Sequence, residues 1–136
     1  METEHPSAKS PKYSVSWGEY FQLTDKLIAT ILQKVGFKYT YIHGIPRGGL
    51  VLAVILSHRL NLKFLETNME LSKLALTEKV LVVDDLVDTG KTLETFSSHF
   101  DTAVLFKKPW STVQPIYYVA ETTKWVIFPY EKNIGA

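Results

Sequence analysis

The residues best suited to chemistry lie in one stretch, Val80 to Thr92, which reads VLVVDDLVDTGKT. Its first four residues are apolar and three of them are β-branched, which is typical of a strand buried on both faces of a parallel sheet. Asp84 and Asp85 are expected at the carboxyl end of this strand, followed by a turn rich in Asp, Thr and Gly. Open α/β sheets bind ligands at this position.

The composition of the turn indicates a phosphorylated sugar as the ligand. Backbone N–H groups before a helix can hold a phosphate, and the hydroxyls of Thr89 and Thr92 can assist. The adjacent carboxylates of Asp84 and Asp85 repel each other, so we expect a metal ion or sugar hydroxyl groups to compensate them. For the two acids alone, helix capping or solvation is the alternative.

The end of the stretch, Gly90-Lys91-Thr92, is also the end of a nucleotide-binding P-loop. That motif requires a glycine five residues before Gly90, where this chain has Asp85. A carboxylate there would face the bound phosphates. The sequence therefore excludes a P-loop.

As a whole, the stretch resembles the phosphoribosyl diphosphate (PRPP) motif of type I phosphoribosyltransferases: a hydrophobic strand, two acids, two apolar residues and Asp-Thr-Gly-x-Thr. The resemblance implies that Asp84 and Asp85 bind the ribose hydroxyls and that Asp85 contacts Mg²⁺ directly or through water. It implies that Asp88 is both part of the PRPP site and the catalytic general base. The residues implied to grip the 5′-phosphate are Thr89, Gly90, Lys91 and Thr92.

A second glycine-rich loop, Gly44 to Gly49, joins a strand predicted over 37–45 to a helix predicted over 50–60. Strand, glycine-rich turn and helix form an anion-binding arrangement, and Arg47 adds a fixed cation. The loop resembles the pyrophosphate loop of the same family. There the backbone at Arg47-Gly48 is strained so that an N–H faces the pyrophosphate, and glycine permits this approach.

The C-terminal part carries the candidate base-binding residues. Lys107 and Lys108 follow a strand predicted over 102–106, and Trp125-Val126 could form a slot for a flat ring, although core packing is the alternative. The pattern Phe-x-Lys-Pro, then Trp-Val-x-Phe-Pro-aromatic-acid, resembles the hood of xanthine/guanine- and hypoxanthine-type phosphoribosyltransferases. This implies that Lys108 bonds the oxygen at purine C6 while Trp125 and Val126 contact the ring.

These motifs require an α/β fold. We expect a mainly parallel sheet flanked by helices on both faces, with a small C-terminal hood. A capping box at Ser16 predicts a helix that ends at Gly36. The predicted organisation is a disordered tail over 1–12 and a single domain over 13–136, with a core over about 13–107 and a hood over about 108–136.

In the family, the region after the predicted strand 62–66 holds a flexible flap that closes over PRPP. Here the corresponding segment, 67–78, has about a dozen residues and lacks the Ser-Tyr pair of many members. Lys73 is a candidate pyrophosphate contact, with simple solvation as the alternative.

Composition narrows the class of protein further. The 136 residues carry a net charge of +1, so charge gives no case for nucleic acid or an anionic membrane. There are no cysteines, and no apolar run is long enough to span a membrane. Residues 1–12 have no signal-peptide pattern. We expect a soluble, cytoplasmic protein.

The resemblance implies an Mg²⁺-dependent transferase of purine salvage. It would move the 5-phosphoribosyl group from PRPP to N9 of hypoxanthine, guanine or xanthine, and would form a homo-oligomer of at least two chains. Two alternatives stay open: transfer to another base such as a pyrimidine or orotate, and a PRPP-binding regulatory protein without catalysis. The short 67–78 segment favours the second, whereas Asp88 and the purine hood oppose it.

Overall fold

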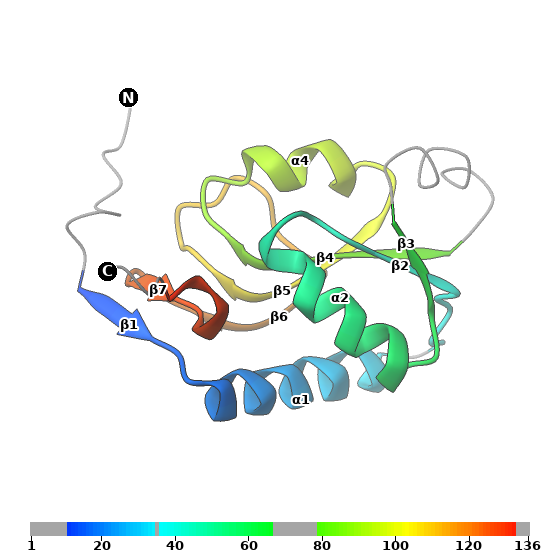
Figure 1. Ribbon diagram of the computed structural model, residues 1–136. Coiled ribbons are helices and arrows are strands. Elements are labelled where there is room, and N and C mark those ends of the chain that lie inside the picture. The colour runs from blue at the N-terminus through cyan, green and yellow to red at the C-terminus, as the bar shows by residue number, and fades with distance from the viewer. Residues whose placement is uncertain (1–10, 35, 67–78, 133–136) are drawn as a thin grey trace.

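The computed structural model describes residues 11–34, 36–66 and 79–132. A five-stranded sheet lies at its centre, and every neighbouring pair of strands is parallel (Figure 1). This confirms the predicted α/β architecture. In spatial order the strands are β3 (Lys63–Leu65), β2 (Tyr41–Gly44), β4 (Val80–Val87), β5 (Asp101–Lys107) and β6 (Tyr117–Glu121).

Helices cover both faces of this sheet, as predicted. Helices α1 (Trp17–Gln33) and α2 (Gly48–Arg59) lie on one face and α4 (Lys91–Ser97) lies on the other (Figure 1). Alternate side chains of β4 enter the two hydrophobic clusters that result. Leu81 and Val83 belong to the cluster of α1 and α2, whereas Val80 and Val82 pack in the cluster of α4. The start of β4 is therefore buried on both faces.

The connections that follow β2 and β4 run in opposite directions across the sheet, although the two strands are parallel. The chain leaves β2 through α2 to reach the outer strand β3, but it leaves β4 through α4 to reach β5 on the other side. The loops at the carboxyl ends of these two neighbouring strands thus diverge and open a crevice. In open α/β sheets such a switch point is where ligands bind.

Strand β4 is longer than its sequence indicates. Pairing with β5 continues through Leu86, opposite Phe106, and Val87, opposite Lys107. Asp84 and Asp85 therefore lie within the strand, and the prediction that they follow it is wrong. The backbone ladder extends the strand here even though the acids interrupt its apolar run.

A separate pair of strands joins distant parts of the chain. Strand β1 (Lys12–Ser14) pairs in parallel with β7 (Trp125–Ile127), and the short helix η1 (Pro129–Glu131) follows. Lys12, placed by the sequence in a disordered tail, is instead part of β1. The rest of that predicted tail up to residue 10, and the predicted flap 67–78 with Lys73, lie outside the described residues.

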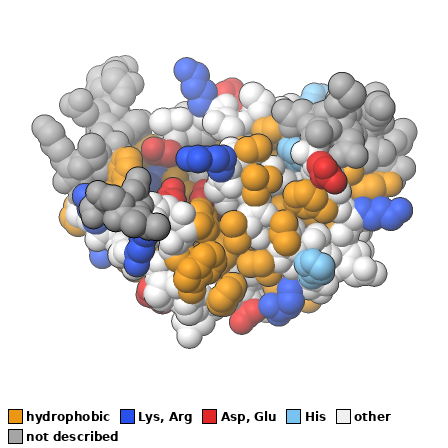
Figure 2. All heavy atoms as spheres, viewed as in Figure 1, with side chains coloured by type: hydrophobic (Ala, Val, Ile, Leu, Met, Phe, Trp, Pro, Cys, Tyr) orange, Lys and Arg blue, Asp and Glu red, His pale blue; other side chains and the backbone are white. Residues whose placement is uncertain are grey.

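An apolar surface is formed by exposed side chains of α1 and α2 (Figure 2). Its large members are Trp17, Phe21, Leu50 and Val54, with exposed fractions between 37% and 49%. A surface of this kind marks a candidate interaction site. No described helix is both long and apolar enough to cross a membrane.

The capping box predicted at Ser16 is present and gives a test of the fold. The Ser16 hydroxyl accepts a hydrogen bond from the Glu19 N–H at 3.1 Å, and Glu19 accepts one from the Ser16 N–H at 3.0 Å. Ser16→Ala should lower the free energy of unfolding by about 1 kcal/mol, because an N–H at the start of α1 loses its partner. Urea denaturation measures this change. Ser14→Ala, an exposed position on β1, is the control, and an equal loss in both variants would contradict the capping role.

Candidate active site

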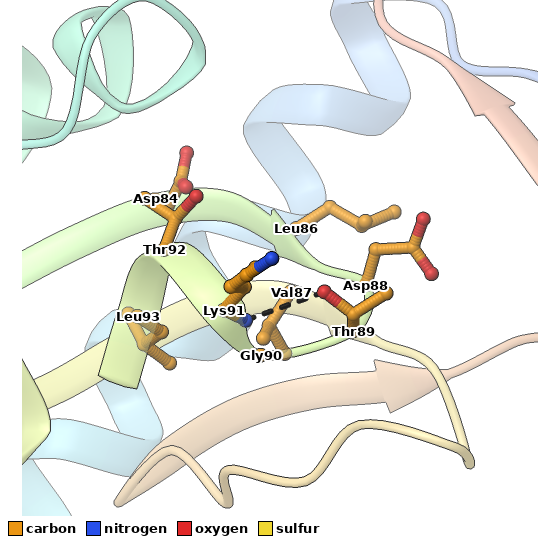
Figure 3. Close-up of a pocket in the computed structure, with 9 residues that line it drawn as sticks. All are labelled: Asp84, Leu86, Val87, Asp88, Thr89, Gly90, Lys91, Thr92 and Leu93. Carbon is orange, nitrogen blue, oxygen red and sulfur yellow. Dashed lines mark hydrogen bonds between the residues drawn. The ribbon is translucent and has the colours of Figure 1, made fainter. Parts of the chain in front are cut away.

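The turn between β4 and α4 forms the first part of the site. Gly90 has φ +97°, and a Cβ there would lie 2.9 Å from the Val113 nitrogen, so both conformation and space require glycine. The Lys91 N–H donates to the Thr89 hydroxyl at 3.3 Å (Figure 3). The hollow at this turn has a volume of about 140 Å³ and is lined by Asp84, Leu86, Val87, Asp88, Thr89, Gly90, Lys91, Thr92 and Leu93.

A second hollow, of about 170 Å³, lies beside the hood. Lys108 is only 3% exposed, and its ammonium donates to the Lys124 carbonyl. Burial lowers the pKa of Lys108, while the charge of Asp88 acts in the opposite direction. The predicted base-binding residues meet here, because the lining consists of Asp85, Leu86, Asp88, Lys108, Trp125, Val126, Phe128 and Glu131.

A third and larger hollow adjoins the start of α2. It measures about 730 Å³ and is lined by Arg47, Gly48, Tyr130, Glu131 and Lys132. The peptide bond between Pro46 and Arg47 is cis. The structure thus places two cations, on Arg47 and Lys132, around the predicted pyrophosphate loop. The sequence indicated Arg47 and Lys73, of which Lys73 lies outside the described residues.

The three hollows adjoin one another through shared residues. Leu86 and Asp88 line both the turn hollow and the hood hollow, and Glu131 lines both the hood hollow and the α2 hollow. Asp88 therefore stands between the predicted phosphate-binding turn and the predicted base slot. Within the described part of the chain, every predicted site residue lines at least one of the three hollows.

The two neighbouring acids of β4 face different hollows because successive strand residues point to opposite faces. Asp84 lines the turn hollow and Asp85 the hood hollow. Asp85 is 9% exposed and accepts a hydrogen bond from the Tyr130 hydroxyl at 2.6 Å. Burial and the charge of Asp85 raise the pKa of Asp84 to about 8. The free protein therefore keeps a proton on Asp84 at neutral pH.

This pair of acids fits a divalent cation that arrives with a ligand. Among the described residues, no three His, Cys, Asp or Glu side chains are grouped as a metal site. Mg²⁺ is commonly held by one or two carboxylates together with substrate phosphates, so a complete protein cage is not required. A cation near Asp84 and Asp85 would also offset their mutual repulsion.

Two contacts near the site could not be read from the motifs. The indole N–H of Trp110 donates to Asp88 Oδ1 at 2.7 Å, and Tyr130 bonds Asp85 as above. The signal available for Trp110 was its place directly after Lys108-Pro109, in a loop at the carboxyl end of a strand.

The sequence left the direction of the Lys107 side chain open. Its ammonium donates a hydrogen bond to Gln114 at 2.6 Å and lies 4.6 Å from the centroid of the Tyr118 ring, on the β5–β6 surface.

Comparison with known proteins shows which proteins this chain is similar to. The chain is 29% identical to the xanthine-guanine phosphoribosyltransferase of Gluconobacter oxydans, over 87% of this chain and 83% of that protein. Among solved structures it matches a purine phosphoribosyltransferase from Pyrococcus horikoshii with a TM-score of 0.72 and 28% identity, over 90% and 95% of the two chains. In sequence and in fold the chain is therefore similar to purine phosphoribosyltransferases.

A further solved structure shares the fold. The Helicobacter pylori xanthine-guanine-hypoxanthine phosphoribosyltransferase matches this chain with a TM-score of 0.71 and 21% identity, over 88% of this chain and 93% of that chain. No family model matches the sequence. The similarity to relatives extends over both the core and the hood, since 87% to 90% of the chain is covered.

The proton on Asp84 gives a test by pH. The unfolded chain loses this proton near pH 3.8 and the folded protein near pH 8, so stability falls as the pH rises between these values. Asp84→Asn removes this loss. Its melting temperature should match that of the wild type near pH 4 and exceed it by several degrees at pH 8, since 1 kcal/mol corresponds to about 4 °C in a domain of this size. Thermal unfolding followed by circular dichroism from pH 4 to 9 measures the difference. Parallel curves for the two proteins would contradict the assigned proton.

Proposed function

We propose that the chain transfers the 5-phosphoribosyl group of PRPP to N9 of a 6-oxopurine and releases pyrophosphate. The observation that carries this proposal is the position of Asp88 between a phosphate-binding turn and a slot with a buried lysine. The name of the Gluconobacter relative, a xanthine-guanine phosphoribosyltransferase, supports the same substrate class. The reaction would belong to purine salvage, and we place it in the cytoplasm.

The turn hollow is the proposed site of the 5′-phosphate. The backbone N–H groups of Gly90 and Lys91 lie at the start of α4, and hydroxyls of Thr89 and Thr92 line the same space. Asp84, in the same hollow, would accept hydrogen bonds from the ribose hydroxyls. The proton that Asp84 holds in the free protein would leave when the substrate binds with its cation.

The hood hollow is the proposed site of the purine. A buried ammonium on Lys108 suits the exocyclic oxygen at C6, because few donors are available to that oxygen once water is excluded. Trp125, 42% exposed, and Val126, 8% exposed, offer an aromatic and a β-branched surface to the ring. A lysine donor favours a 6-oxopurine over adenine, whose 6-amino group is itself a donor.

The chemistry requires a leaving anion and a cationic sugar to be stabilised at the same time. Arg47, beside the largest hollow, would bind the departing pyrophosphate, and the Gly48 backbone approaches the same space. Mg²⁺, held by Asp85 and Asp84, would supply further charge neutralisation to PRPP. Asp88 would accept the purine proton, from N7, as N9 forms its bond to ribose C1′.

The apolar surface of α1 and α2 supports the proposed homo-oligomer. This surface begins directly after Arg47, because α2 starts at Gly48. Pairing of two such surfaces would remove exposed Trp17 and Leu50 side chains from water. The pyrophosphate loop would then lie near the contact between chains.

Base-dependent release of pyrophosphate tests the reaction. With PRPP and Mg²⁺ present, we expect release with hypoxanthine, guanine or xanthine, and none with adenine, uracil or orotate. A coupled pyrophosphate assay with each base in turn measures this. Release with uracil or orotate alone would contradict the assignment of the hood. PRPP binding without release for any base would identify a regulatory protein instead.

Replacement of Asp88 tests the general base. Asp88→Asn should lower kcat by about 100-fold or more, the usual range for loss of a positioned base, with little change in PRPP affinity. Steady-state kinetics and calorimetric titration with PRPP measure the two effects. Asp25→Asn, an exposed position on α1, is the matched control. Equal losses of turnover and PRPP affinity would remove Asp88 from this role.

A further inference from the structure

Trp110 contacts two groups that the proposed reaction needs in different roles. Its indole N–H donates to Asp88 Oδ1 at 2.7 Å. The ammonium of Lys108 lies over the same ring, 5.4 Å from its centroid. The ring therefore meets a carboxylate at its edge and a cation at its face, which matches the charge distribution of an aromatic ring.

The loop that carries Trp110 is hydrogen-bonded to the turn between β4 and α4. The N–H and hydroxyl of Thr112 both donate to the Thr89 carbonyl, at 2.9 Å and 3.0 Å. The Ser111 N–H donates to the Lys108 carbonyl at 3.1 Å. Trp110 is thus held between fixed backbone contacts, and its indole can set the orientation of the Asp88 side chain.

The indole bond has two consequences for Asp88. It satisfies Oδ1, and because Asp88 lines the hood hollow, Oδ2 is the oxygen that we assign to a ligand there. It also competes with a direct ion pair between Asp88 and Lys108, which line the same hollow and carry opposite charges. Such a pair would turn the carboxylate away from a purine proton and the ammonium away from a purine oxygen.

We propose that Trp110 is the positioning residue of the general base, which it orients through its indole N–H while its face keeps Lys108 apart from Asp88. This inference rests on the proposed function. In the step concerned, the bond from ribose C1′ to the pyrophosphate oxygen breaks and the bond from C1′ to N9 forms. The proton on purine N7 moves to Asp88 Oδ2.

Two substitutions distinguish the effect of the indole N–H of Trp110 from the effect of its aromatic face. Trp110→Phe keeps an aromatic face for Lys108 but removes the N–H, so kcat should fall about tenfold, the effect of one lost hydrogen bond to a charged group, with KM for PRPP and purine nearly unchanged. Trp110→Leu removes both contacts and should in addition raise KM for the purine. Tyr118→Phe on β6, a 40% exposed aromatic position away from the three hollows, is the control and should leave kcat unchanged.

A purine substrate with a more acidic ring N–H gives a second measurement, one that a purely structural role of Trp110 would not affect. An 8-aza analogue of the accepted 6-oxopurine gives up its ring proton more readily, so it should depend less on the oriented base. We expect the kcat loss of Trp110→Phe to be several-fold smaller with the analogue than with the natural purine.

Three results would overturn the proposal: an unchanged kcat in Trp110→Phe, an equal loss with both purines, or a loss that accompanies a lower melting temperature and a higher KM for PRPP. These results are distinct from failure of the proposed function, because in that case the wild-type protein itself would release no pyrophosphate with any 6-oxopurine.

Discussion

The close contact between the start of α2 and strand β4 sets the geometry of the site. A Cβ on Gly48 would lie 2.1 Å from Asp85 Oδ2, and one on Gly49 would lie 2.5 Å from the Val83 carbonyl oxygen. A Cβ on Gly44, at the end of β2, would likewise lie 2.5 Å from the Gly49 carbonyl oxygen. No side chain fits at these positions, so the helix can rest directly on the sheet. This contact places Arg47 at the same crevice as Asp85, and the predicted pyrophosphate loop depends on it.

Electrostatics in the crevice favour ligand binding over stability. Asp84 and Asp85 are neighbours in a buried strand, and the pKa of Asp84 is raised to about 8 because its ionised form is poorly solvated and lies near another acid. A stable core would place apolar side chains here. The chain instead keeps two acids that a cation and sugar hydroxyls can satisfy, which is the usual relation between a binding site and the stability of its scaffold.

The sequence predicts the parallel sheet, the helices on both faces and the three groups of site residues, because each depends on a local pattern. An apolar run marks β4, a capping box marks α1, and glycines mark the two loops. The extent of β4 could not be predicted in this way, since pairing with β5 continues it past two acids. The same holds for β1, whose three residues form a strand only because β7 lies beside them. Trp110 was missed for a related reason: its bond to Asp88 joins two loops that only the folded sheet brings together.

The pairing of β1 with β7 links the strand that carries Trp125 to the start of the described chain. Pro11 accepts a hydrogen bond from the Trp125 N–H at 3.0 Å, and the Val15 N–H donates to Ile127 at 2.9 Å, so the strand that carries Trp125 is braced by a segment more than a hundred residues earlier. The predicted PRPP residues, from Arg47 to Thr92, lie between these two segments, whereas Tyr130 and Lys132, which line the hollow beside Arg47, follow them. Residues 11–15 therefore support the strand that carries Trp125 without lining the turn hollow.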